Sequence, residues 1–208
     1  MRKEKLDELH EYIEELKTIR RTLVERKADE RGFLNVEKYM VELANGMVVP
    51  REKITKGKKD KSAAIILPIT EDNNTILVVQ SRSSTLESVS VELPAGYIEQ
   101  EETPIAGAER ELLEETGYLP KRLILLDKFY QDQSCGVCAY NYSFLAQDCK
   151  KVQDQSLDKD EALRFFECSI PEAMELMQQG YITDIQSKYT LNLAKPYVYQ
   201  KTNARPQK

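Results

Sequence analysis

One predicted helix carries the residues best suited to chemistry. Thr103 can cap its first turn, Pro104 is tolerated at its first position, and Gly117 suits a left-handed exit from its end. At about 100° per residue, apolar residues fall on one side of this helix and charged residues on the other. The charged side chains that share an arc are Arg110, Glu111, Glu114 and Glu115. Three carboxylates therefore occupy one face of the helix.

This crowding of carboxylates indicates a cation site. Like charges three or four residues apart destabilise a helix by a few tenths of a kcal/mol per pair, and a bound cation removes that cost. Mg²⁺ prefers oxygen ligands and fills its remaining positions with water and substrate phosphates, so it can promote cleavage of a diphosphate. Arg110, four residues before Glu114, is expected to orient a carboxylate. An ordinary charged surface, as at Glu14-Glu15, is the alternative when the three glutamates are considered alone.

The segment around the helix resembles the Nudix box, a loop-helix-loop signature of pyrophosphohydrolases. The match runs from Gly96 to Tyr118, and Tyr118 is a mild departure because an aliphatic residue is usual there. All the fixed positions agree: Gly96, Glu102, Arg110, Glu111, Glu114, Glu115 and Gly117. The resemblance implies an α/β fold, the Nudix α/β/α sandwich with a mixed sheet.

The resemblance also implies roles for individual residues. Glu111, Glu114 and Glu115 are expected to bind two or three Mg²⁺ ions, with Mn²⁺ as an alternative, or to hold the metal-bound water. The Ala95 carbonyl is expected to assist as a metal ligand. Arg110 and Glu102 are expected to be orienting partners. Catalysis is thus assigned to Glu115 and Glu114, helped by Arg110.

The flanking sequence is similar to the ADP-ribose and nucleotide-sugar pyrophosphatases, roughly over residues 36–194. The similar segments are Arg51-Glu52, Gln80-Ser81-Arg82, the residues from Glu92 to Gly96, and those from Phe166 to Ala194. This similarity implies that Arg82, Arg51 and Glu92 contact the substrate. For Arg82, a surface charge at the end of a strand is an equal alternative. With ADP-ribose as substrate, the products implied are AMP and ribose 5-phosphate.

An acidic loop after the box is where such relatives often carry the catalytic base. In this chain the loop holds Asp154, Asp158, Asp160 and Glu161. Counting back from Phe165-Phe166 makes Glu161 the preferred candidate. A solvated acidic surface loop is the commonest alternative.

The substrate stays open because residues 131–137 lack the proline that ADP-ribose hydrolases of this group commonly carry there. Ser134-Cys135-Gly136-Val137 stands in its place. The alternatives are a dinucleoside polyphosphate, another nucleotide sugar or an oxidised nucleotide. A non-catalytic nucleotide-sensing domain is a hypothesis from another class, although such a domain is expected to lose some of the three glutamates that this chain retains.

Histidine and cysteine chemistry has little support. The only histidine, His10, lies in a charged N-terminal segment, so a serine or cysteine nucleophile lacks a partner base. Cys135 and Cys138 have CxxC spacing without a second close pair, which favours plain loop or strand positions over a metal or redox site. Acid and base chemistry therefore falls to carboxylates.

The elements that position the helix form a mixed pattern. Apolar runs predict strands over residues 63–69, 76–79, 122–129, 139–146 and 163–168, and helices over 171–179 and 184–194. Residues 36–43 and 47–50 around Asn45-Gly46 predict a hairpin, followed by a basic stretch, 51–61, that favours a solvated loop over a phosphate contact. Without regular βαβ alternation, we expect a mixed sheet between helices.

The chain is predicted to divide into three parts. Residues 1–35 hold an amphipathic helix over about 3–31, whose apolar stripe packs either on its own domain or on a second subunit. Residues 36–195 form the Nudix domain with its hairpin. Residues 196–208 form a polar tail, which together with Lys195 is expected to be loose.

Composition limits the class of protein and its partners. With 208 residues, of which 41% are hydrophobic, the chain can bury one sizeable core. Its net charge of -5 argues against long nucleic acid as a partner. The longest apolar run, residues 63–67, is too short to cross a membrane, and the charged start lacks a signal-peptide core. We expect a cytoplasmic homodimer that acts on a small nucleoside diphosphate compound.

Overall fold

The computed structural model describes residues 3–16, 34–42, 48–56, 62–83, 85–131, 139–159 and 161–203. Its helices are α1 (Lys3–Leu16), α2 (Pro104–Thr116), α3 (Ile170–Gln178) and α4 (Ile185–Asn203). Its strands are β1 (Leu34–Glu42), β2 (Val48–Lys56), β3 (Ala63–Thr70), β4 (Asn74–Ser81), β5 (Val89–Glu92), β6 (Ala95–Tyr97), β7 (Tyr118–Leu119), β8 (Arg122–Tyr130), β9 (Tyr140–Lys151) and β10 (Leu163–Ser169).

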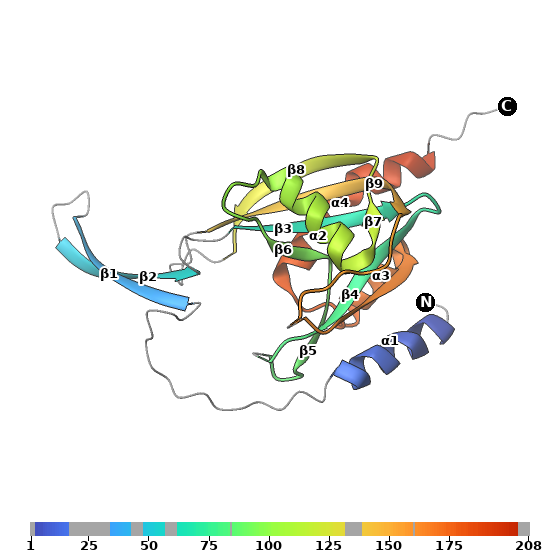
Figure 1. Ribbon diagram of the computed structural model, residues 1–208, viewed down its shortest axis with the longest axis horizontal. Helices are drawn as coiled ribbons and strands as arrows, with labels where there is room; N and C mark the ends of the chain where they lie inside the picture. Colours follow the sequence, from blue (N-terminus) through green and yellow to red (C-terminus); the bar gives the residue numbers. More distant parts are fainter. Residues whose placement is uncertain are drawn as a thin grey trace.

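The main sheet is mixed and lies between layers of helices (Figure 1). Within the described chain it contains eight strands along the path β10-β4-β3-β9-β7, with β5 beside β4, β6 beside β3 and β8 beside β9. Strands β3 and β9 pair in parallel, and the other pairings described are antiparallel. This confirms the predicted α/β class and the mixed sheet.

Two buried clusters hold the layers together. Because side chains alternate along a strand, Ala64 and Ile66 of β3 face α2, whereas Ile65 and Leu67 face the opposite layer. The cluster under α2 includes Ala108, Leu112, Tyr118 and Phe144. The cluster on the other face includes residues of α1, α3 and α4, among them Leu9, Ala173, Leu176 and Leu191. The sheet therefore presents α2, the helix with the glutamates, on a face of its own.

The N-terminal helix packs on the chain's own sheet in this structure. Leu9 is fully buried within the core cluster that contains Leu77 and Phe166, and Tyr12 and Ile13 pack against the same cluster. The predicted continuation of the helix to residue 31 lies outside the described residues. None of the described helices combines the length and apolar character needed to cross a membrane.

The predicted hairpin is confirmed in its two strands, and β1 and β2 form a separate two-stranded antiparallel sheet (Figure 1). The Asn45-Gly46 turn lies outside the described residues. The prediction that a loop begins at Arg51 was wrong, since β2 continues to Lys56. In a two-stranded sheet both strands are edges, so neither a proline nor a polar run has to end the pairing.

The predicted loose tail was also wrong at its start. Helix α4 continues through Pro196 to Asn203. The polar composition of this segment predicted a loose tail, and proline, which lacks an amide N–H, normally ends a helix. Val198 packs against the core beyond this proline and supports the longer helix.

Candidate active site

Helix α2 is bounded as the sequence predicted. The Thr103 hydroxyl accepts a hydrogen bond from the Ala106 amide at 3.2 Å, and Pro104 opens the helix. Gly117 has a φ of 78° and donates its amide to the Leu113 carbonyl at 2.8 Å. A side chain at Gly117 would also collide with the Gln153 carbonyl. Both ends of the helix are therefore fixed by local chemistry.

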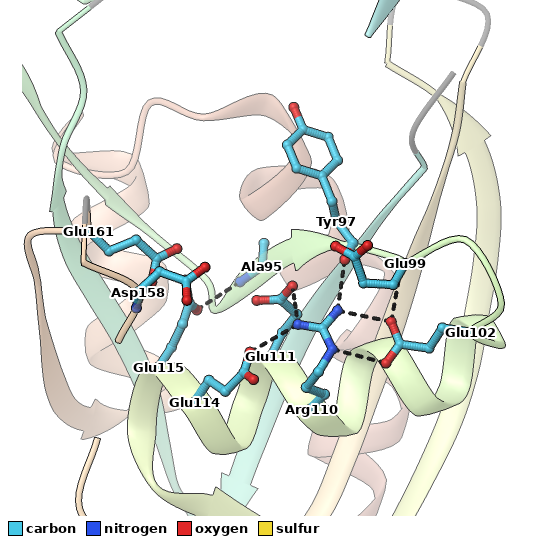
Figure 2. A network of polar contacts seen from close by, with 10 residues as sticks. All are labelled: Ala95, Tyr97, Glu99, Glu102, Arg110, Glu111, Glu114, Glu115, Asp158 and Glu161. Carbon is cyan, nitrogen blue, oxygen red and sulfur yellow. Dashed lines mark hydrogen bonds and ion pairs between the residues drawn. The ribbon is translucent and has the colours of Figure 1, made fainter. Parts of the chain in front are cut away.

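Arg110 is the centre of a polar network on α2 (Figure 2). Its Nε and Nη2 donate to the two carboxylate oxygens of Glu102, each at 2.9 Å. Its Nη1 donates to Glu111 at 2.8 Å and to Glu114 at 2.9 Å. Its Nη2 also donates to the Tyr97 carbonyl at 2.8 Å. These five hydrogen bonds use the five N–H donors of a guanidinium.

Glu102 connects this network to the loop before the helix. The Arg110 hydrogen bonds lower the pKa of Glu102, and the Glu99 amide donates to the same carboxylate at 3.0 Å. The two hydrogen bonds between Arg110 and Glu102 form a bidentate pair, which fixes the plane of the Arg110 guanidinium. The structure thus brings together Glu102 and Arg110, the predicted orienting partners. The Tyr97 carbonyl, a further acceptor, carried no signal in the sequence.

Glu111 lies against the backbone of Gly96. A Cβ at Gly96 would overlap the Glu111 carboxylate, so the close approach requires glycine. Burial raises the pKa of Glu111 to about 7, although Arg110 acts in the opposite direction. Its charge is therefore easily lost near neutral pH in the absence of a further cation.

Glu115 is the most buried of the three acids, with 3% of its surface exposed. Its carboxylate accepts a hydrogen bond from the Ala95 amide at 3.0 Å. Burial and then the charge of Glu111 raise the pKa of Glu115 well above its ordinary value. The predicted use of the Ala95 carbonyl as a metal ligand stays a prediction, because the contact described is made by the amide N–H.

The acidic loop lies beside these glutamates, with Asp158 and Glu161 next to Glu115 in Figure 2. The charge of Glu161 contributes to the raised pKa of both Glu111 and Glu115, which places it within electrostatic reach of the pair. Asp154 instead is fully exposed beside Lys151, 3.5 Å away. Asp160 lies outside the described residues. Of the loop's acids, Asp158 and Glu161 are the two that Figure 2 shows beside the site.

Arg82 and Glu92, both predicted to contact substrate, bind each other. The Arg82 Nε and Nη2 donate to Glu92 at 2.9 Å and 2.6 Å, and Gln80 donates to the same carboxylate at 3.1 Å. Although burial opposes the charge of Arg82, the hydrogen bonds to Glu92 raise its pKa, and the charge of Glu115 adds to this effect. Arg82 therefore lies near the acids of α2. The Arg51 side chain lies outside the described residues, as do Cys135 and Cys138.

The donor chemistry of the site fits a hard divalent cation. Within the described residues no three acidic, histidine or cysteine side chains meet around one point, and Arg110 forms ion pairs with both Glu111 and Glu114. Burial is the largest cause of the raised pKa values of the Glu111 and Glu115 carboxylates, and a bound cation would favour their charged forms. Oxygen donors of this kind suit Mg²⁺, which would compete with Arg110 for them.

Comparison with known proteins decides the family. Residues 59–186 match the NUDIX domain. The chain is 33% identical over 152 residues to the ADP-ribose pyrophosphatase of Bacillus subtilis (strain 168), covering 73% of this chain and 79% of the relative. The chain belongs to the Nudix family.

Further relatives of this Nudix hydrolase differ in their described roles. This chain is 32% identical over 144 residues to the methanol dehydrogenase activator of Bacillus methanolicus, and the match covers 69% of this chain and 75% of that protein. A solved structure of an ADP compounds hydrolase superposes with a TM-score of 0.70 at 23% identity, covering 84% of this chain and 92% of the other. This superposition confirms the predicted Nudix fold. Nudix hydrolases generally use divalent metals such as Mg²⁺.

Proposed function

We propose that this Nudix hydrolase uses Mg²⁺ to hydrolyse the diphosphate bridge of a nucleoside diphosphate derivative. The favoured substrate is ADP-ribose, giving AMP and ribose 5-phosphate, or a related nucleotide sugar. The observation that carries the proposal is the burial of Glu111 and Glu115 together, with raised pKa values, beside Arg82. The similarity to an ADP-ribose pyrophosphatase over 73% of the chain supports the choice of substrate.

In this proposal the acids of α2 form the metal site. Glu111, Glu114 and Glu115, with the Ala95 carbonyl, would hold two or three ions, and these would supply the positive charge that diphosphate cleavage needs. Arg110 keeps Glu111 and Glu114 on one side of the helix through its hydrogen bonds. Glu161, beside Glu115, accepts a proton from the attacking water.

Substrate binding is assigned to the pair of Arg82 and Glu92. Glu92 is buried and its carboxylate accepts hydrogen bonds from two nitrogens of the Arg82 guanidinium, so Glu92 fixes the orientation of the Arg82 side chain. The Arg82 side chain is 41% exposed and can approach a phosphate from beside the acids. Arg51 is proposed as a second contact from the hairpin.

A substrate screen tests the function. The purified protein is incubated with Mg²⁺ or Mn²⁺ and, in separate reactions, ADP-ribose, other nucleotide sugars, dinucleoside polyphosphates and oxidised nucleotides, and the products are separated by ion-exchange chromatography. We expect the highest kcat/KM with ADP-ribose or a nucleotide sugar, and no products in EDTA. A higher kcat/KM with one of the other classes of compound would change the assigned substrate but would keep the proposed reaction type, hydrolysis of a diphosphate bridge. Binding of these compounds without any turnover would overturn the proposed hydrolase activity and would favour a role as a nucleotide sensor.

We also propose that the protein is a homodimer. The hairpin β1–β2 exposes large apolar side chains, namely Leu34 (61%), Met40 (63%) and Val48 (58%). An isolated two-stranded hairpin is at best marginally stable in water, so a partner surface would stabilise it. Light scattering is expected to give about twice the chain mass of 24.0 kDa. A mass equal to one chain over the working concentration range would overturn the dimer.

A further inference from the structure

The acidic loop is fastened to the C-terminal turn of α2. The name acidic loop denotes residues 152–159 and 161–162. The Gln155 side-chain amide donates to the Glu115 carbonyl at 2.5 Å. The Ser156 amide donates to the Glu114 carbonyl at 2.9 Å, and the Val152 amide donates to the Gly117 carbonyl at 2.9 Å. The Gln153 amide also donates to the Gly117 carbonyl, at 3.3 Å, so four neutral N–H donors of the loop bind carbonyls at the end of the helix.

These contacts oppose an electrostatic repulsion. The last carbonyls of a helix carry partial negative charge and lack partners inside the helix. The loop that approaches them carries Asp158 and Glu161, and the helix itself carries Glu114 and Glu115. Like charges thus face each other across the contact, and neutral amide donors satisfy the carbonyls without neutralising the acids.

The far end of the loop is held as well. The Ser81 amide, at the end of β4, donates to the Ala162 carbonyl at 3.2 Å. Between the two anchors, the Glu161 amide donates to the Asp158 carbonyl at 3.0 Å, and the Asp158 amide donates to the Glu161 carboxylate at 3.2 Å. This turn orients Glu161, while the two anchors place it beside Glu115, as Figure 2 shows.

We propose that Gln155 is a positioning residue, which holds the acidic loop on α2 so that the Glu161 carboxylate lies beside Glu115. Among the side chains of the described loop, Gln155 is the one that donates a hydrogen bond to α2, and its acceptor is the backbone carbonyl of Glu115, whose carboxylate enters the site. The role rests on the proposed function. No sequence pattern announces it, because Gln155 and Glu115 are 40 residues apart.

The test is a double-mutant cycle between Gln155 and Glu161. Gln155→Leu removes the donor with little change in size, Glu161→Gln removes the charge, and Gln153→Leu, at an exposed position of the same loop, is the control. On the best substrate of the wild-type protein we expect kcat to fall about tenfold in Gln155→Leu and about a hundredfold in Glu161→Gln. We expect KM to stay within about twofold, and Gln153→Leu to match the wild type.

The double variant decides between positioning and general support of the fold. If Gln155 acts through Glu161, the double variant has the kcat of Glu161→Gln alone, within about twofold. Losses that multiply, a wild-type kcat in Gln155→Leu, or a wild-type kcat in Glu161→Gln would each overturn the role. Should Gln155→Leu fail to fold, Gln155→Glu, which keeps the shape and loses the donor when ionised, takes its place in the cycle. A wild-type protein without turnover on any compound would overturn the proposed function and this role with it.

Discussion

Glu115 is a buried acid whose surroundings oppose its charge. Burial and the neighbouring Glu111 both raise its pKa, and its hydrogen bond from the Ala95 amide acts in the opposite direction. A group in such a place costs stability when it is ionised, so its presence calls for a function that uses the charge. At the proposed site that use is to bind a divalent cation.

The substitution Glu115→Gln separates function from fold. The amide is nearly isosteric, keeps an acceptor for the Ala95 amide and removes the opposed charge. We expect kcat with Mg²⁺ to fall by about a hundredfold or more, while the melting temperature in EDTA is unchanged or higher. Steady-state kinetics and thermal unfolding measure the two effects. A variant that keeps turnover near the wild-type level would remove Glu115 from the site.

Glu111 gives the metal-free protein a distinct pH dependence. Its folded-state pKa, about 7, is raised above the ordinary value, so the folded state binds its proton more tightly than the unfolded state. The stabilising contribution is present below pH of about 5 and is lost as the pH rises through 7, on the order of 2 kcal/mol. Glu115 acts in the same direction. Glu102, whose pKa is lowered, loses its contribution only at more acidic pH.

We therefore expect the urea midpoint in EDTA to decrease between pH of about 5 and about 8. Glu111→Gln is the matched control, because it removes this titration and should flatten the decrease. Parallel curves for the two proteins would contradict the assignment.

At the scale of elements, α2 is held by its two ends. Gly117 combines a left-handed φ of 78° with a backbone carbonyl where a side chain would lie. Gly180 has a similar φ of 85°, but a Cβ there would meet nothing within 4 Å. Comparing substitutions at these two glycines separates the cost of the left-handed backbone conformation from the cost of the steric clash between a side chain and the Gln153 carbonyl.

Gly180→Ala should lower the free energy of unfolding by about 1 kcal/mol, the cost of the left-handed conformation alone. Gly117→Ala should lower it by at least about 2 kcal/mol more, since the Gln153 backbone has to move. Gly117→Ala should also reduce turnover, because the Val152 amide at the start of the acidic loop donates to the Gly117 carbonyl. Chemical denaturation of the two variants gives the comparison, and equal losses would contradict it.

Helix α2 and most strands could be predicted from the sequence because their signals are local. Thr103, Pro104 and Gly117 mark the helix, and apolar periodicity marks the buried strands. The pairing of Arg82 with Glu92 could not be predicted, because it depends on the register of β4 against β5. The contact of Gln155 with Glu115 likewise joins two segments that only the folded sheet brings together.

Local signals also misled at two places. The polar residues from Lys195 onward predicted a loose tail, yet α4 continues to Asn203 and Val198 packs against the core. The charged run after Pro50 predicted a loop, yet backbone pairing with β1 continues to Lys56. In both cases contacts across the chain outweighed the preferences of a few residues.

At the scale of the whole molecule, α1 contributes to the main core. Leu9 is fully buried, so Leu9→Ala should lower the free energy of unfolding by about 3 kcal/mol through lost packing and a cavity. Leu86→Ala is the control, because Leu86 is 90% exposed and its removal should cost little. Chemical denaturation of both variants measures the difference. A Leu9→Ala protein as stable as the control would show that α1 packs elsewhere in solution.

The parallel pairing of β3 with β9 sets the order in which activity can be gained during refolding. Its register joins Ala63 to Asn141, so the chain must close a long loop, which contains all of α2, before the centre of the sheet exists. The acidic loop leaves β9 directly and reaches α2 only once that strand is in place. In a stopped-flow refolding experiment, hydrolytic activity should therefore never recover before the native sheet has formed, even if α2 becomes helical earlier.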